Sequence, residues 1–92
     1  MIISFKHKGL EKFFHTGHNA GIHAAHVSKL RAVLARLDAI EAPSDMNLPG
    51  LRFHRLKGDR HADYSISVSK SWRITFKFID NEVRDVNYED YH

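Results

Sequence analysis

Residues 71–79, Ser-Trp-Arg-Ile-Thr-Phe-Lys-Phe-Ile, carry the most regular hydrophobic pattern in the chain. Apolar side chains occupy every second position, at Trp72, Ile74, Phe76 and Phe78. Because successive side chains of a strand point to opposite faces, this period of two predicts a half-buried strand with an aromatic face inward. The other face holds Arg73, Thr75 and Lys77. A strand ordered through its core face holds such cations at fixed positions.

Two earlier stretches have the period of a helix. The first has apolar residues at i, i+3 and i+4, namely Leu10, Phe13 and Phe14. This stripe predicts a short helix that ends at Gly17, with a loop at 18–21. The second runs from Ile22 to about Glu41 and is rich in alanine, which favours helix. Its apolar positions are Val27, Leu30, Val33, Leu34, Leu37 and Ile40. We expect both stripes to pack on a sheet.

The remaining segments predict the other strands. They are Met1–Phe5, Leu51–Leu56, Tyr64–Ser69 and Val83–Tyr91. Residues 41–50 contain two prolines and form a loop, while short turns at 57–60 and 80–81 join strands that pair antiparallel. We expect Val86 and Tyr88 to point inward. The order β-α-α-β-β-β-β predicts an α+β domain over residues 1–92, with two N-terminal helices packed on a small, mostly antiparallel sheet.

Composition narrows the class of protein. The chain has no cysteine, which excludes a disulfide scaffold, a cysteine-ligated zinc site and a cysteine nucleophile. No apolar run approaches the roughly 18 residues of a membrane span, and the start lacks the apolar core of a secretory signal. The sequence therefore favours a soluble cytoplasmic protein that does not enter a membrane.

The charge is unevenly placed along the chain. The net charge is +3, but residues 52–77 carry seven lysines and arginines against two carboxylates. Residues 78–92 carry one arginine against five carboxylates. Clustered cations are typical of proteins that bind a polyanion, most often nucleic acid. Charge alone does not distinguish this from a solvated surface of mixed sign.

Four of the eight histidines have the spacing His-x2-His-x4-His-x2-His, at His15, His18, His23 and His26. Two histidines at i, i+3 on one helix face can share a metal ion. The first pair, however, spans the predicted end of a helix and a loop, and the domain has a core without a metal. We therefore expect surface histidines and no metal site.

Two other histidines lie in a different context. His54 falls in the basic stretch, on a predicted strand, and His92 is the last residue, directly after a predicted strand. Two imidazoles beside cations are suited to metal-free RNA cleavage, in which a base takes the 2′-OH proton and an acid protonates the leaving 5′-oxygen. Histidine serves either role because its pKa lies near neutrality. Many basic domains with two histidines are not nucleases, so the spacing alone is a weak signal.

Several motifs resemble the HigB toxins of the RelE/ParE superfamily. They are Met1–Leu10, Leu56–Arg60, Ser65–Val68, Trp72–Phe76 and Asn87–His92. The resemblance covers the whole chain, and it implies a RelE-like fold. It also implies the toxin of a type II toxin–antitoxin system, a ribosome-dependent messenger RNA endonuclease that cuts codons in the A site without a metal or cofactor.

The resemblance also implies the site residues. The family's active-site positions fall on His54, Lys57, Arg73, Asp90, Tyr91 and His92. Lys57 and Arg73 are then expected to bind phosphate and stabilise charge in the transition state, and the two histidines to act as acid and base. Which of them is the base is left open. Asp90 is expected to orient or assist, and Tyr91 to stack on a base or to position the phosphate. Lys77 has no such role and is expected to be an ordinary solvated lysine.

The implied partners are a HigA-type helix-turn-helix antitoxin, the ribosome and messenger RNA, with operator DNA bound only through the antitoxin complex. Two alternatives remain. One is a ParE-like inhibitor of gyrase, which shares the fold but does not use a terminal histidine. The other is a non-catalytic nucleic-acid-binding module, whose binding would weaken steeply with salt without forming a product.

Overall fold

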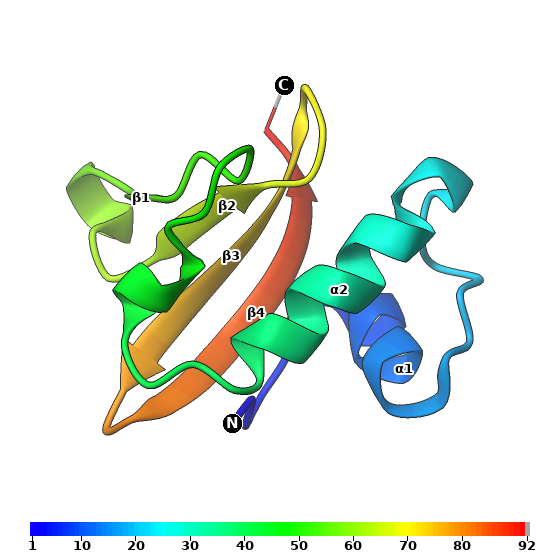
Figure 1. Cartoon of the computed structure of the whole chain (residues 1–92), viewed down its shortest axis with the longest axis horizontal. Coiled ribbons are helices and arrows are strands. Elements are labelled where there is room, and N and C mark those ends of the chain that lie inside the picture. The colour runs from blue at the N-terminus through cyan, green and yellow to red at the C-terminus, as the bar shows by residue number, and fades with distance from the viewer. Residues whose placement is uncertain (92) are drawn as a thin grey trace.

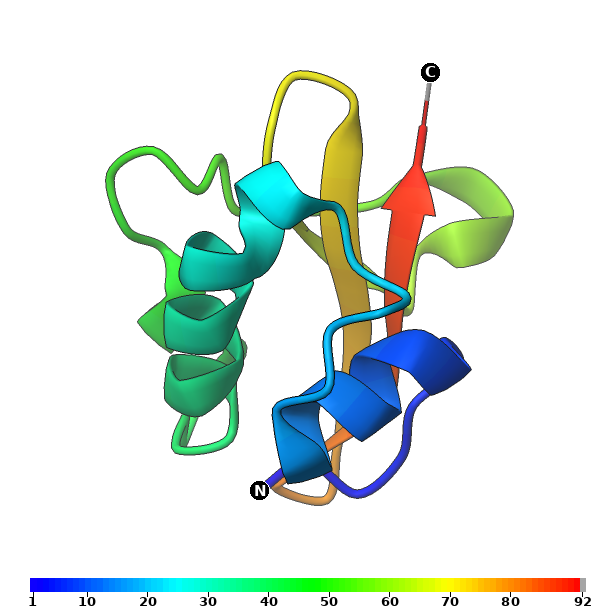
Figure 2. The same ribbon diagram turned by 90° about the vertical axis from the view of Figure 1, so that its right-hand side faces the viewer.

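Two helices lie on one face of a four-stranded antiparallel sheet (Figures 1 and 2). The computed structural model describes residues 1–91. The main elements are α1 (Lys8–Thr16), α2 (Val27–Leu37), β1 (His54–Arg55), β2 (Tyr64–Ser67), β3 (Trp72–Ile79) and β4 (Glu82–Asp90). Three short 3-10 turns are η1 (Ala24–His26), η2 (Pro43–Met46) and η3 (Gly58–Arg60). The strands follow the order β1-β2-β3-β4. The expected α+β architecture of two layers is therefore confirmed.

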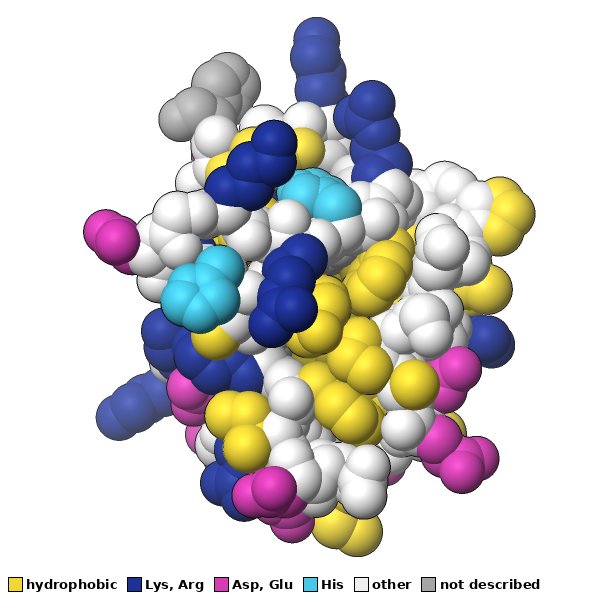
Figure 3. All heavy atoms as spheres, turned by 90° about the vertical axis from the view of Figure 1, so that its left-hand side faces the viewer, with side chains coloured by type: hydrophobic (Ala, Val, Ile, Leu, Met, Phe, Trp, Pro, Cys, Tyr) yellow, Lys and Arg dark blue, Asp and Glu magenta, His cyan; other side chains and the backbone are white. Residues whose placement is uncertain are grey.

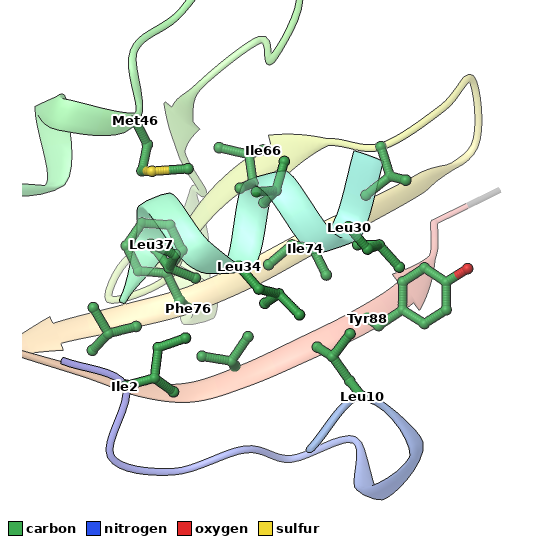
Figure 4. Close-up of a cluster of buried hydrophobic side chains, with 14 of the residues drawn as sticks. Ile2, Leu10, Leu30, Leu34, Leu37, Met46, Ile66, Ile74, Phe76 and Tyr88 are labelled. Atoms are coloured by element: carbon green, nitrogen blue, oxygen red, sulfur yellow. The ribbon is translucent and has the colours of Figure 1, made fainter. Parts of the chain in front are cut away.

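Strand β3 is the centre of the sheet, as its alternation predicts. It pairs antiparallel with β2 on one side and with β4 on the other. Ile74 and Phe76 are fully buried beneath α2 (Figure 4), while Trp72 and Phe78 at the two ends are half-buried. Other core side chains come from both helices and from β4, including Leu10, Leu30, Leu34, Leu37, Val86 and Tyr88. The inward positions of Val86 and Tyr88 are confirmed.

Helix α1 ends where its sequence predicts. Gly17 has φ 80°, and its N–H donates to the carbonyl of Phe13 at 2.9 Å. This left-handed conformation suits glycine, which has no Cβ to clash. At the other end His7 caps the helix, because its Nδ1 accepts the N–H of Leu10 at 2.9 Å. That cap was not predicted, since histidine is not among the usual capping residues.

Helix α2 is shorter than the predicted helix over 22–41, because the turn η1 precedes it and the helix ends at Leu37. The apolar stripe nevertheless faces the sheet as expected. Among residues 1–91, no helix combines the length and the apolar character needed to cross a membrane.

The start of α2 is tied to the sheet by His26. The expectation that this histidine lies on the surface is wrong: it is buried, with Nδ1 2.5 Å from the Tyr88 hydroxyl and Nε2 3.0 Å from the Ser69 hydroxyl. Burial lowers the pKa of His26, and the nearby charges of His23 and Lys29 lower it further. His26 thus links η1, directly before α2, to β4 and to the loop between β2 and β3.

The N-terminal segment pairs with β4 less regularly than a full strand. Ile2 bridges to Val83 and Phe5 to Val86, both in parallel. Between these bridges β4 contains an irregularity in register, where Asp85 adopts φ 53°. An extra residue in one strand interrupts a ladder and bends it, so the predicted strand over 1–5 becomes two separate bridges.

The predicted strand over 51–56 is also reduced, to His54–Arg55. Arg52 has φ 49°, which lies outside the extended region that a strand requires. The segment still follows β2, because the carbonyl of Leu51 accepts the N–H of Ser67 at 2.6 Å. The left-handed residue therefore interrupts the strand without separating it from the sheet.

The Phe76→Ala substitution should lower the free energy of unfolding by about 3–5 kcal/mol, because it leaves a cavity under α2 in a fully buried position. Urea denaturation followed by circular dichroism measures this change. The matched control is Ile79→Ala on the same strand, where the side chain is 47% exposed and the loss should stay within about 0.5 kcal/mol. Equal losses at the two positions would contradict the assignment of the core face.

Candidate functional site

A pocket of about 170 Å³ lies on the side of β3 that carries Arg73, opposite the face on which the helices pack. Its lining residues are Arg52, His54, Ser65, Ser67, Arg73 and Tyr91. Three of the residues predicted from sequence therefore meet there: His54, Arg73 and Tyr91. Figure 3 shows the side of the molecule that carries β1, where histidine side chains lie among lysines and arginines in the upper half.

Strand register places these side chains on a common face. His54 pairs with Ser65, and Ser67 pairs with Arg73. Since residues directly opposite in neighbouring strands share a face, the pocket floor is built from β1, β2 and β3. Arg73 in turn pairs with Glu89 on β4. The alternation that buries Ile74 on the helix side thus directs its neighbour Arg73 into the pocket.

The ring of His54 is fixed by the unusual backbone before it. Its Nδ1 lies 2.9 Å from the carbonyl oxygen of Arg52, the residue with φ 49°. A carbonyl oxygen only accepts hydrogen bonds, so Nδ1 carries the proton of the neutral ring and Nε2 keeps a free lone pair. The exposed His54 side chain therefore offers a proton acceptor at the pocket.

Arg73 is held from two sides. Its Nε donates to Oε1 of Glu89 at 2.9 Å, and its Nη2 lies 2.8 Å from the same oxygen. The guanidinium carbon lies 4.7 Å from the centre of the Tyr91 ring, a cation–π arrangement. Tyr91 is fixed by its own N–H, which donates to the carbonyl of Ser71 at 2.9 Å, and by its hydroxyl, which donates to the carbonyl of Lys70 at 3.1 Å.

Glu89 is a residue of this site that the sequence did not single out. Its carboxylate also accepts hydrogen bonds from Arg60, through Nη1 at 2.8 Å and Nη2 at 3.3 Å, and from Nδ2 of Asn87 at 3.0 Å. Burial acts to raise the pKa of Glu89, but the hydrogen bonds from Arg60 and Arg73 outweigh it and hold the pKa below its ordinary value. Glu89 therefore stays ionised between two arginines.

The ion pairs continue along the same face. Arg60 also contacts Asp63 at 3.1 Å, and Nζ of Lys77 lies 2.8 Å from the other oxygen of Asp63 and 3.6 Å from Asp85. The expectation that Lys77 is an ordinary solvated lysine is therefore wrong. The hydrogen bond to Asp63 raises the pKa of Lys77. Burial acts to raise the pKa of Asp63, but its bonds to Lys77 and Arg60 prevail and lower it.

Two other predicted site residues, Lys57 and Asp90, do not line the pocket. Lys57 is exposed and directly precedes η3. Asp90 is exposed at the end of β4 and pairs with Trp72, which places it on the opposite face from Arg73 and Glu89. His92 lies outside the described residues. The roles of these three residues stay predictions.

The histidines with the spacing His-x2-His-x4-His-x2-His lie in different surroundings. His15 packs against the rings of Phe5 and Phe14, whereas His26 is buried against Tyr88. Within the described part of the chain, no group of three or more histidine, cysteine, aspartate or glutamate side chains is placed to hold a metal ion.

Chemically, the pocket combines an imidazole whose Nε2 is available to accept a proton with a guanidinium, held by Glu89, that can bind an oxyanion. Proton abstraction next to a fixed cation is the arrangement that general-base attack on a phosphodiester requires. The serines and Arg52 that complete the lining were missed from sequence, because neither their spacing nor their type marks them out.

Comparisons of the sequence with a family model and with curated proteins all point to the same family. A family model described as "RelE-like toxin of type II toxin-antitoxin system HigB" matches residues 3–92. The chain is 42% identical to the endoribonuclease HigB of Proteus vulgaris over 92 residues, the full length of both chains. It is 35% identical to toxin HigB-1 of Vibrio cholerae serotype O1 over 85 residues, which are 87% of this chain and 86% of that protein.

Two solved structures share the fold. A mutant of YafQ from E. coli superposes with a TM-score of 0.58 at 15% identity, covering 98% of this chain and 93% of the other. A chain of the YoeB–YefM complex from Staphylococcus aureus also superposes with a TM-score of 0.58, at 17% identity. The match covers 100% of this chain and 98% of the other. At such low identity the likeness establishes the fold alone.

The Asp63→Asn substitution should lower the free energy of unfolding at pH 7 by about 1.5–3 kcal/mol, because charge-assisted bonds to Lys77 and Arg60 are lost. A carboxylate whose folded pKa is depressed contributes stability above its unfolded pKa and loses it as pH falls below about 4. The difference from wild type should therefore shrink towards pH 3, as measured by urea denaturation at both pH values.

The control for this prediction is Asp80→Asn, in the exposed turn between β3 and β4. It makes the same chemical change at a surface position and should shift the stability by less than about 0.5 kcal/mol. A deficit of Asp63→Asn that stays constant from pH 7 to pH 3 would show that the ionised carboxylate is not its cause.

Proposed function

We propose that this chain, which belongs to the HigB family of RelE-like toxins of type II toxin–antitoxin systems, is an endoribonuclease that cleaves messenger RNA in the ribosomal A site. The full-length identity to a protein named an endoribonuclease supports the activity. The observation that carries the proposal is the pocket in which the free Nε2 of His54 and the fixed guanidinium of Arg73 face a common space.

In the proposed step, Nε2 of His54 takes the proton of the ribose 2′-OH, and the 2′-oxygen attacks the adjacent phosphorus. The bond to the 5′-oxygen breaks, leaving a 2′,3′-cyclic phosphate and a 5′-OH. The tautomer fixed by the Arg52 carbonyl favours His54 as the base. His92 then has the complementary role, protonation of the leaving 5′-oxygen.

The cations and the aromatic ring have separate tasks in this proposal. Arg73 binds the phosphate and stabilises the extra negative charge in the transition state, with Lys57 as a second phosphate contact from the loop at η3. The ring of Tyr91 supports Arg73 on one face, and its 42% exposure leaves room for an RNA base to stack. Asp90, which precedes His92 by two residues, has the role of assisting His92 in this proposal.

The proposed reaction draws its base, acid and charge stabilisation from side chains, so it needs neither a metal nor a cofactor. The proposed setting is the cytoplasm, with the ribosome and messenger RNA as targets. The antitoxin partner that the family description implies is proposed to be a HigA-type helix-turn-helix protein, which brings the toxin to operator DNA as a complex.

The His54→Ala variant should lose at least about a hundredfold in cleavage rate, the usual contribution of a general base. The assay uses purified ribosomes programmed with a defined messenger RNA, and primer extension locates the cut. His61→Ala is the matched control, because His61 is also exposed on the basic segment but does not line the pocket. Its rate should equal that of the wild type.

Three results would contradict the proposal in different ways. Equal rates for His54→Ala and wild type would remove His54 from the reaction. Inhibition of supercoiling with translation unaffected would indicate a gyrase inhibitor. Salt-sensitive RNA binding without any product ending in a cyclic phosphate would indicate a non-catalytic binding module.

A further inference from the structure

We propose that Glu89 is a positioning residue of this site, which presents Arg73 to the scissile phosphate and couples it, through Arg60, to the loop that carries Lys57. The inference rests on the proposed RNA cleavage and extends it to two residues that have no assigned role. Glu89 lies on β4, directly opposite Arg73 on β3.

The first support is geometric. Glu89 engages one edge of the Arg73 guanidinium, through Nε and Nη2, while the Tyr91 ring covers a face of the same group. A guanidinium has five N–H donors in a rigid plane, so an edge with Nη1 remains for a phosphate oxygen. The side chain of Arg73 is only 17% exposed. Its orientation is therefore set before RNA arrives.

The second support is electrostatic. A carboxylate beside a polyanion opposes binding, so Glu89 lowers the affinity for RNA unless it contributes something else. Its contribution is to hold Arg73 in one conformation before RNA binds. Arg73 therefore loses less conformational entropy when it binds the phosphate. Because Arg60 and Arg73 share the single carboxylate of Glu89, these three side chains together keep a positive charge.

The third support is the connection to the loop at η3. Arg60 is the last residue of η3 and follows Lys57 by three positions. Its guanidinium is anchored at both Glu89 and Asp63. The segment that carries Lys57 is thereby attached to β4, the strand whose Glu89 holds Arg73. The two proposed phosphate contacts, Lys57 and Arg73, are therefore both positioned relative to Glu89.

The test is Glu89→Gln in the ribosome cleavage assay, with single-turnover rates measured over a range of toxin concentrations. The substitution keeps the shape but removes the charge that holds both arginines. The rate at saturating toxin should fall about tenfold to a hundredfold, while the toxin concentration at half-saturation should stay equal or decrease, because a repulsive charge has been removed. A surface carboxylate without a positioning role would give an unchanged or higher rate.

Glu82→Gln is the matched control. Glu82 begins the same strand, β4, and pairs with Arg84 away from the pocket. The change in net charge is the same as in Glu89→Gln, so the toxin concentration at half-saturation should change similarly. The cleavage rate at saturating toxin, however, should match that of the wild type. Thermal unfolding of both variants shows whether the fold is retained.

A second variant, Asn87→Ala, tests the inference without changing any charge. It removes the hydrogen bond from Nδ2 to Oε2 of Glu89 and should lower the saturating rate about threefold, even if Glu89→Gln does not fold. Wild-type rates in both variants, or in Asn87→Ala alone if Glu89→Gln is unfolded, would overturn this inference and leave the proposed function intact. Absence of cleavage by the wild type would overturn both.

Discussion

The antiparallel register between β3 and β4 is the constraint on which the rest of the structure depends. It places the Glu89 carboxylate opposite Arg73, and it is fixed by the other face of the same strands, where Ile74 and Tyr88 are buried. A slip of one residue would turn Glu89 into the core and Tyr88 out of it. The cost of such a slip is the loss of the apolar surface that β4 buries through Val83, Val86 and Tyr88. The hydrophobic core thus determines which charged groups meet on the opposite face.

The two faces differ in what they contribute. Burial of a side chain such as Phe76 contributes several kcal/mol, whereas a partly exposed ion pair contributes about 1 kcal/mol or less. The partly exposed ion pairs between Arg73 and Asp85 therefore contribute little to stability, and the buried carboxylate of Asp63 is the exception among them. These ion pairs do, however, hold long, flexible side chains in single orientations. This suggests that the core stabilises the fold and the ion pairs determine where the cations point.

The sequence predicts the core face of the sheet better than the ion pairs on the opposite face. The alternation at 71–79 was sufficient to identify β3 and the face of Arg73, and the left-handed C-cap at Gly17 was predictable from residue type. These features depend on local periodicity and on backbone preference. The partner of Arg73 was not predictable in this way, because Glu89 lies 16 residues away and is brought opposite only by the register. The contact of Lys77 with Asp63 depends in addition on the path of a loop.

Other differences also come from tertiary context. The burial of His26 depends on how the turn η1 is rotated against Tyr88, which the histidine spacing does not specify. The shortened β1 results from the left-handed backbone of Arg52, a conformation that arginine rarely adopts and no sequence pattern announces. His54 and Arg73 were assigned by family resemblance, and both line one pocket. Asp90 was assigned in the same way but lies on the other face.

Core and site residues alternate along the same two strands, Trp72 next to Arg73 and Tyr88 next to Glu89. A site built on strands is held more rigidly than one built on loops. Here Arg73 and Glu89 each have a buried neighbour, Ile74 and Tyr88, that fixes the backbone. Tyr91 extends this order one residue beyond β4 through its bond to Ser71. Arg73, Glu89 and Tyr91 therefore form the fixed part of the site, to which the proposed reaction adds Lys57 and His92.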